Sequence, residues 1–317
     1  MAVATTSAQP QPAVAFRPGM NRVTFTSEGD ALVGNLFLPA SYTERTKLPL
    51  IIIGGAWLTV KEQMPNLYAR RLADRGLAAL TFDFRGFGES EGSPRHYESA
   101  ARKSADIANA AAFARELPVT EPERIGALGI CASGGYMARA IAEGAPIAAL
   151  ATVAAWFHDL AALGSFYGGA EGIADRMALA KTAREKYQRT GAVDQVAAYD
   201  PNDPSAAMFF PLDYYASTER GAVRAWPNKF AVMSWTDWFT YNGLVSAPSV
   251  TVPTLMVHSD EAVFPDNARR FFAALRGPKD LFWTQGTQTD FYDKDPYAAK
   301  AVDAATAHFN RELSTNR

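Results

Sequence analysis

The chain has 317 residues, of which 48% are hydrophobic and 20% charged, and its formal net charge is −2. This is the composition of a globular protein with enough apolar material for one large α/β domain or two smaller ones. The near-neutral charge excludes a basic surface for nucleic acid or anionic lipid. The chain has one cysteine, so it cannot form an internal disulfide, and no apolar run reaches the roughly 18–20 residues of a membrane span. We therefore expect a cytoplasmic protein that binds neither nucleic acid nor membrane.

Residues 1–20 are rich in Ala, Pro, Gln, Thr and Ser, without the basic start and apolar middle of a signal peptide. This composition predicts a disordered N-terminal tail, with a docking arm for another subunit as the alternative. Nothing else in the sequence bears on oligomeric state, and a homodimer stays an open option.

Beyond the tail, apolar segments alternate with segments of helical spacing. The first two apolar segments alternate with period two and predict a hairpin, whereas later ones are continuous and predict strands buried on both faces. Strands that alternate with helices predict a mostly parallel sheet flanked by helices. The predicted strands are 22–26, 31–38, 48–53, 77–82, 124–128, 147–153, 254–258 and 281–284, and the main helices are 65–75, 99–117, 136–142, 265–275 and 296–313.

This alternation fails between residues 158 and 249, where helical pieces around 172–189 are followed by several prolines and many aromatic residues. An irregular insert between two sheet strands predicts a helical lid over the carboxyl edge of the sheet. The predicted core is then formed by residues 21–157 and 250–317.

Residues 129–135 join a strand to a helix through small side chains, which is the setting of a nucleophile elbow. The turn requires small residues two positions before and two after the nucleophile. Gly129 and Ser133 meet this requirement, and the residue between them is Cys131. The alternative interpretation is a small buried cysteine at a strand end.

The elbow at 129–134, the glycine-rich turn at 83–90 and Asp260 after a strand occur in this order along the chain. Together they resemble the α/β-hydrolase superfamily over most of the chain, and a cysteine nucleophile resembles its dienelactone-hydrolase group. The resemblance implies an α/β-hydrolase fold with a mostly parallel eight-stranded sheet.

Position by position, the resemblance implies that Cys131 is the nucleophile. The backbone N–H of Ala132 and that of Ala56 or Trp57 would form the oxyanion hole. Asp260 falls on the position of the acid, and its neighbour Glu261 is the alternative.

The superfamily's histidine is missing from the loop 286–290, where Gln288 stands in its place. A glutamine amide cannot accept and return a proton near neutral pH. Of the four histidines, His158 ends the strand beside the elbow strand and is predicted to replace the missing base. We rank His96, His258 and His308 below it.

The sequence therefore predicts an enzyme that hydrolyses an ester, thioester or lactone of a hydrophobic small molecule through an acyl-enzyme at Cys131. A thiol at a helix N-terminus is expected to have a lowered pKa. The alternative is a lidded pocket with a non-hydrolytic role, as a lyase, a cyclase or a binding protein. No metal or other cofactor is predicted, and the expected substrate-binding side chains are those of Trp57, Phe157, Trp235 and Trp238.

Overall fold

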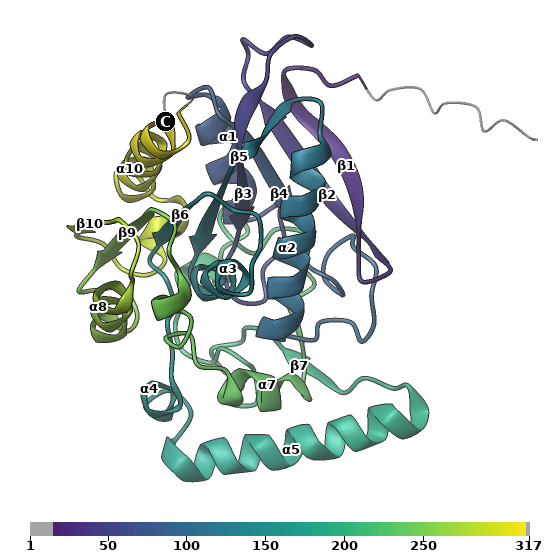
Figure 1. Cartoon of the computed structure of the whole chain (residues 1–317). Helices are drawn as coiled ribbons and strands as arrows, with labels where there is room; N and C mark the ends of the chain where they lie inside the picture. The colour runs from purple at the N-terminus through teal and green to yellow at the C-terminus, as the bar shows by residue number, and fades with distance from the viewer. Residues whose placement is uncertain (1–14, 315–317) are drawn as a thin grey trace, which may run out of the picture.

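The central feature of the fold is one eight-stranded sheet in the order β1-β2-β4-β3-β5-β6-β9-β10 (Figure 1). The structure is a computed structural model that describes residues 15–314. β1 and β2 pair antiparallel, as do β2 and β4, and every pairing from β4 to β10 is parallel. The mostly parallel eight-stranded sheet is thus confirmed. The strands are β1 (Gly19–Ser27), β2 (Asp30–Leu38), β3 (Leu48–Gly54), β4 (Ala78–Phe82), β5 (Thr120–Ile130), β6 (Ala149–Val153), β9 (Thr254–Ser259) and β10 (Lys279–Thr284).

Helices cover both faces of this sheet. α1 (Met64–Ala73) and α10 (Tyr297–Glu312) pack together on one face, while α2 (Ala100–Glu116), α3 (Ala132–Ala142) and α8 (Pro265–Ala274) lie on the other (Figure 1). Strands sandwiched in this way are buried on both sides, which is why their sequences are continuous apolar runs and not alternating ones.

The segment between β6 and β9 forms an insert, which we define as residues 158–249. Its longest helix, α5, runs along one end of the molecule and packs against α4 and α7 (Figure 1). The elements of the insert are α4 (Leu160–Gly164), α5 (Gly169–Thr190), β7 (Gln195–Ala197), α6 (Asp213–Ala216), β8 (Lys229–Ala231), α7 (Ser234–Thr240) and the 3₁₀-helix η1 (Ala247–Ser249).

The part of the chain that the structure describes begins inside the predicted N-terminal tail. The predicted tail, 1–20, lies outside the described residues up to residue 14, and Gly19 and Met20 already belong to β1, so the predicted end of the tail is too late. Among the helices within residues 15–314, none has the length and apolar character needed to cross a membrane.

The strand order of the sheet determines where the candidate active site lies. β3, β5, β6, β9 and β10 run parallel, so the loops that follow them meet at one edge of the sheet. A short helix, α9 (Asp290–Asp293), follows the loop after β10 at this edge.

Candidate active site

Cys131 lies in a sharp turn between β5 and α3. Its backbone has φ +55° and ψ −124°, a conformation that residues with a side chain adopt at a cost in energy. The turn is held by hydrogen bonds from the Cys131 N–H to the Val153 carbonyl (3.1 Å) and from the Trp156 N–H to the Cys131 carbonyl (3.0 Å). At Gly129 a Cβ atom would lie 2.5 Å from the Ser133 carbonyl oxygen, so only glycine fits. The turn has the backbone geometry of a nucleophile elbow.

The sulfur of Cys131 is surrounded by hydrogen-bond donors. The backbone N–H groups of Trp57 and Ala132, the hydroxyl of Tyr292 and the side-chain amide of Gln288 all lie close to it. Of the two candidates in the loop after β3, the N–H group that lies close to the sulfur is that of Trp57. Donors that converge on one buried point are the arrangement that stabilises developing negative charge.

Burial of Cys131 and the donor groups around its sulfur have opposite effects on the pKa of the thiol. Only 3% of Cys131 is exposed, and this desolvation raises the pKa of the thiol, although the donor groups around the sulfur act to lower it. The net direction is upward, so the lowered pKa expected from the helix N-terminus is contradicted. The neutral thiol is therefore the resting form of Cys131 near pH 7.

Cys131 opens into a narrow cavity of about 50 Å³, enough for a few water molecules. Side chains from the sheet edge form one side of this cavity, and side chains of the insert form the other. Among the described residues that line it, the ionisable ones are Cys131 and tyrosines, with no histidine, carboxylate, lysine or arginine. The lining residues are Trp57, Cys131, Trp156, Tyr167, Met208, Phe210, Leu212, Tyr215, Trp238, Val263, Gln288, Thr289 and Tyr292.

Gln288 reaches the cavity from the loop after β10, where the superfamily's histidine was expected. Its Oε1 accepts from the Val263 N–H (3.0 Å), while its Nε2 donates to the Ala154 carbonyl (2.8 Å) and to the Tyr292 hydroxyl (3.2 Å). The backbone groups of Val263 and Ala154 therefore fix the direction of the amide. Gln288 is part of the site as a donor.

His158 does not reach the sulfur. Its Nδ1 accepts from the Trp156 indole N–H (3.0 Å), and its Nε2 faces the Trp238 carbonyl at 3.0 Å. Burial lowers the pKa of this histidine to about 4, so it stays neutral. The ring is not part of the cavity lining and has no free nitrogen, because the two hydrogen bonds hold it between β6 and α7. The structure therefore does not support His158 as the proton shuttle.

The predicted acid is also turned away from the site. Asp260 follows β9, but its side chain is 69% exposed and pairs with Arg269, which lowers the pKa of its carboxyl group. Glu261 is exposed and faces the outer surface beside Gln288. Neither carboxylate lines the cavity, because the loop after β9 directs both side chains outward.

Of the four predicted substrate-binding residues, Trp57 and Trp238 line the cavity and stack on each other, with ring centroids 4.3 Å apart. Phe157 is fully buried and stacks on Phe271 of α8, and Trp235 packs against Phe239 and Trp57, so neither residue lines the cavity. The sequence reading missed Tyr292. It lies within α9, four residues after Gln288, and that spacing is the signal that could have revealed it.

A surface depression of about 610 Å³ adjoins the cavity. It shares Leu212, Gln288 and Thr289 with the cavity lining. These three residues thus separate the buried thiol from the outside. Charged side chains surround the depression, among them Asp213, which pairs with Arg220 and Lys294.

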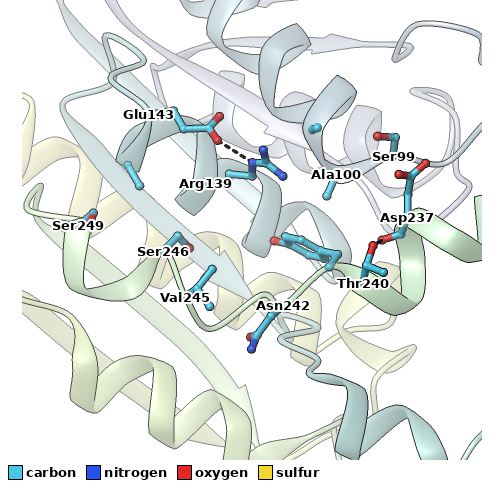
Figure 2. A pocket seen from close by; sticks show the side chains of 13 residues that line it. Ser99, Ala100, Arg139, Glu143, Asp237, Thr240, Asn242, Val245, Ser246 and Ser249 are labelled. Carbon is cyan, nitrogen blue, oxygen red and sulfur yellow. Dashed lines mark hydrogen bonds and ion pairs between the residues drawn. The ribbon is translucent and has the colours of Figure 1, made fainter.

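A separate pocket of about 530 Å³ lies elsewhere, between the start of α2, the end of α3 and the segment after α7 (Figure 2). Its charged members Arg139 and Glu143 pair with each other at 2.8 Å (Figure 2). Cys131 is not among its lining residues, so this pocket gives no access to the thiol.

Three carboxylates, those of Glu62, Asp83 and Glu89, gather near the start of α1. The ammonium group of Lys61 lies among them, at 2.7 Å from Glu62, 2.6 Å from Asp83 and 2.6 Å from Glu89. A cation of the protein's own thus already neutralises this cluster, and its role is to fix the loop after β3 on the turn after β4.

The sheet order and the strained turn after β5 define an α/β hydrolase. Residues 28–290 match the family described as X-Pro dipeptidyl-peptidase (S15 family), and the chain belongs to this family. It is therefore a hydrolase of the α/β-hydrolase type.

Among curated proteins, the chain is 31% identical over 294 residues to the uncharacterized protein PA2218 of Pseudomonas aeruginosa, covering 86% of this chain and 76% of that protein. It is 32% identical over 127 residues to polyketide transferase claH of Penicillium crustosum, covering 39% of this chain and 41% of that one.

Among solved structures, α/β hydrolase GrgF from Penicillium sp. sh18 superposes with a TM-score of 0.79 at 20% identity, covering 93% of this chain and 99% of that one. Dienelactone hydrolase from Anabaena variabilis gives a TM-score of 0.57 at 12% identity, covering 94% of this chain and 100% of that one. These likenesses support the fold.

Proposed function

We propose that this protein transfers acyl groups through Cys131, which takes the acyl group from an ester, thioester or lactone of a hydrophobic small molecule to form an acyl-enzyme. The observation that carries the proposal is the convergence of donors on the sulfur at a strained turn. The N–H groups of Trp57 and Ala132 would then hold the oxyanion that forms on the substrate carbonyl.

The insert would act as a lid. It contributes Tyr167, Met208, Phe210, Tyr215 and Trp238 to the cavity wall, so a bound acyl chain would be enclosed by aromatic and apolar side chains. Because the cavity is narrow, the segment at Leu212 would have to move for a substrate to enter from the outer depression.

Water is one acceptor of the acyl group, and the result is hydrolysis. A second candidate is transfer to an alcohol, thiol or carbon acceptor without hydrolysis, as in lactone formation or cyclisation. The cavity favours this candidate because its described lining holds no histidine or carboxylate to activate water. The similarity to claH, a protein named for polyketide transfer, also favours it.

Turnover of simple acyl donors tests the proposal. The protein would be incubated with p-nitrophenyl butyrate and with the hexanoyl thioester of N-acetylcysteamine, with and without an added alcohol or thiol acceptor. We expect release of the leaving group by the parent protein and none above background by Cys131→Ala. Equal release by the two proteins would contradict the proposal, and release that requires an acceptor would identify the second candidate.

A further inference from the structure

We propose that Tyr292 is the catalytic proton carrier of this site, with its neutral hydroxyl passing the thiol proton of Cys131 to the leaving group. The inference rests on the proposed acyl transfer and names the residue that takes the place of the missing histidine. Tyr292 is suited to this role because its hydroxyl lies close to the reacting sulfur and the residue lines the same cavity.

The hydrogen bonds of Gln288 limit which groups the Tyr292 hydroxyl can donate to. Both hydrogens of the Gln288 amide nitrogen are in use, one on the Ala154 carbonyl and one on the Tyr292 oxygen. The amide oxygen is held by the Val263 N–H, so the amide cannot turn around and accept from Tyr292. The hydroxyl hydrogen of Tyr292 is therefore not directed to Gln288. Its remaining partners are the Cys131 sulfur and the Tyr215 hydroxyl.

Because Gln288 occupies only one lone pair of the Tyr292 oxygen and does not take the hydroxyl hydrogen, the other lone pair is available to the thiol proton and the hydroxyl hydrogen can turn toward a bound leaving group. In the acylation step the sulfur of Cys131 attacks the acyl carbon and the bond from that carbon to the leaving group breaks. The thiol proton passes to the Tyr292 oxygen while the hydroxyl hydrogen of Tyr292 passes to the leaving group. Tyr292 ends unchanged, and the products are the acyl-enzyme and a neutral alcohol or thiol. Transfer to an acceptor runs through the same relay in reverse.

The surroundings favour a relay in which no ion is formed. Tyr292 is 2% exposed, and burial together with the nearby Cys131 and Tyr215 raises the pKa of its hydroxyl well above the ordinary value. Those two are the titratable groups that face the hydroxyl, and Tyr214 packs against its ring. A tyrosine with a raised pKa does not act as a base in its ionised phenolate form near neutral pH. Its neutral hydroxyl can still accept one proton while it gives up another, so that no charge forms on the side chain.

The test compares the parent protein with Tyr292→Phe. Each is mixed with the hexanoyl thioester of N-acetylcysteamine, and the acyl adduct on the intact protein is followed by mass spectrometry from pH 6 to 8. We expect Tyr292→Phe to form the adduct at least about 100-fold more slowly at pH 7, the size of a general acid–base contribution. The parent rate should change little with pH. The residual rate of Tyr292→Phe should rise about tenfold per pH unit, because only the thiolate can then attack.

The matched control is Tyr214→Phe. It removes a buried hydroxyl from the same aromatic cluster, but this hydroxyl accepts from the Met64 N–H and does not line the cavity. It should keep the parent rate and pH profile, and melting temperatures of all three proteins should show that they are folded. A loss below about tenfold in Tyr292→Phe, or a pH profile like that of the parent, would overturn the role of Tyr292 alone. No adduct on the parent protein would overturn the proposed function as well.

Discussion

The two sides of the cavity are built in different ways. At the sheet edge, the site combines backbone, namely the strained turn at Cys131 and the N–H groups of Trp57 and Ala132, with the polar side chains of Gln288 and Tyr292. The insert supplies only side chains, which are aromatic or apolar. The difference indicates that the sheet edge carries the chemistry and the insert encloses the substrate. Changes on the two sides should therefore have different consequences.

The largest effect on stability is expected at Gly129, where neighbouring backbone atoms leave no room for a side chain. In Gly129→Ala the new Cβ would lie 2.5 Å from the Ser133 carbonyl oxygen and 2.6 Å from the Gly134 Cα, both backbone atoms that cannot move aside. We expect the free energy of unfolding to fall by about 3 kcal/mol, measured by urea denaturation.

Gly164→Ala, in α4 of the insert, is the control. A Cβ there has only the Gly169 Cα nearby, at 3.9 Å, so the stability should stay the same or increase slightly. Equal losses in the two variants would contradict the view that the elbow is the tighter region.

Gln288→His restores a base at the sheet edge. Its imidazole would stand next to Cys131 and Tyr292, and a positioned base accelerates proton transfer by about 10²–10⁴-fold. Hydrolysis of p-nitrophenyl butyrate should therefore increase, by about 100-fold at pH 7.5. Gln288→Asn, which keeps an amide but shortens the side chain, should give no such gain. If Gln288→His hydrolyses no faster than the parent, the missing histidine is not what limits hydrolysis.

Burial of the thiol predicts a measurable pH shift. Because desolvation favours the neutral thiol and raises its pKa, the thiolate should appear at higher pH in the folded protein than in the unfolded chain. Iodoacetamide labelling of Cys131 as a function of pH, in buffer and in urea, compares the two states. A folded protein that is labelled at lower pH than the unfolded chain would show that the donors around the sulfur outweigh burial.

The smallest effect is expected at His158. His158→Gln can still accept from the Trp156 indole and donate to the Trp238 carbonyl. Acylation of Cys131 should stay within about threefold of the parent rate, a change of less than 1 kcal/mol in the barrier. A loss of a hundredfold or more in a folded His158→Gln protein would return the role of base to this histidine.

The sequence was informative where structure is set locally. The spacing of small residues around Cys131 predicted the elbow, and continuous apolar runs predicted the parallel strands. It was less informative where side chains meet across the fold. The direction of Asp260 depends on Arg269 nine residues later, and that of His158 depends on Trp238 of the insert. Tyr292 was missed because its partner, Cys131, is distant in the chain, and only its spacing from Gln288 pointed to it.

The central claim is that Cys131 carries an acyl group. Its most direct test is the mass of the intact protein after brief exposure to the hexanoyl thioester of N-acetylcysteamine, followed by peptide mapping. The account predicts a gain of one hexanoyl group, located on the peptide that contains Cys131 and absent in Cys131→Ala. An unmodified Cys131 in a protein that still turns over the thioester would contradict it.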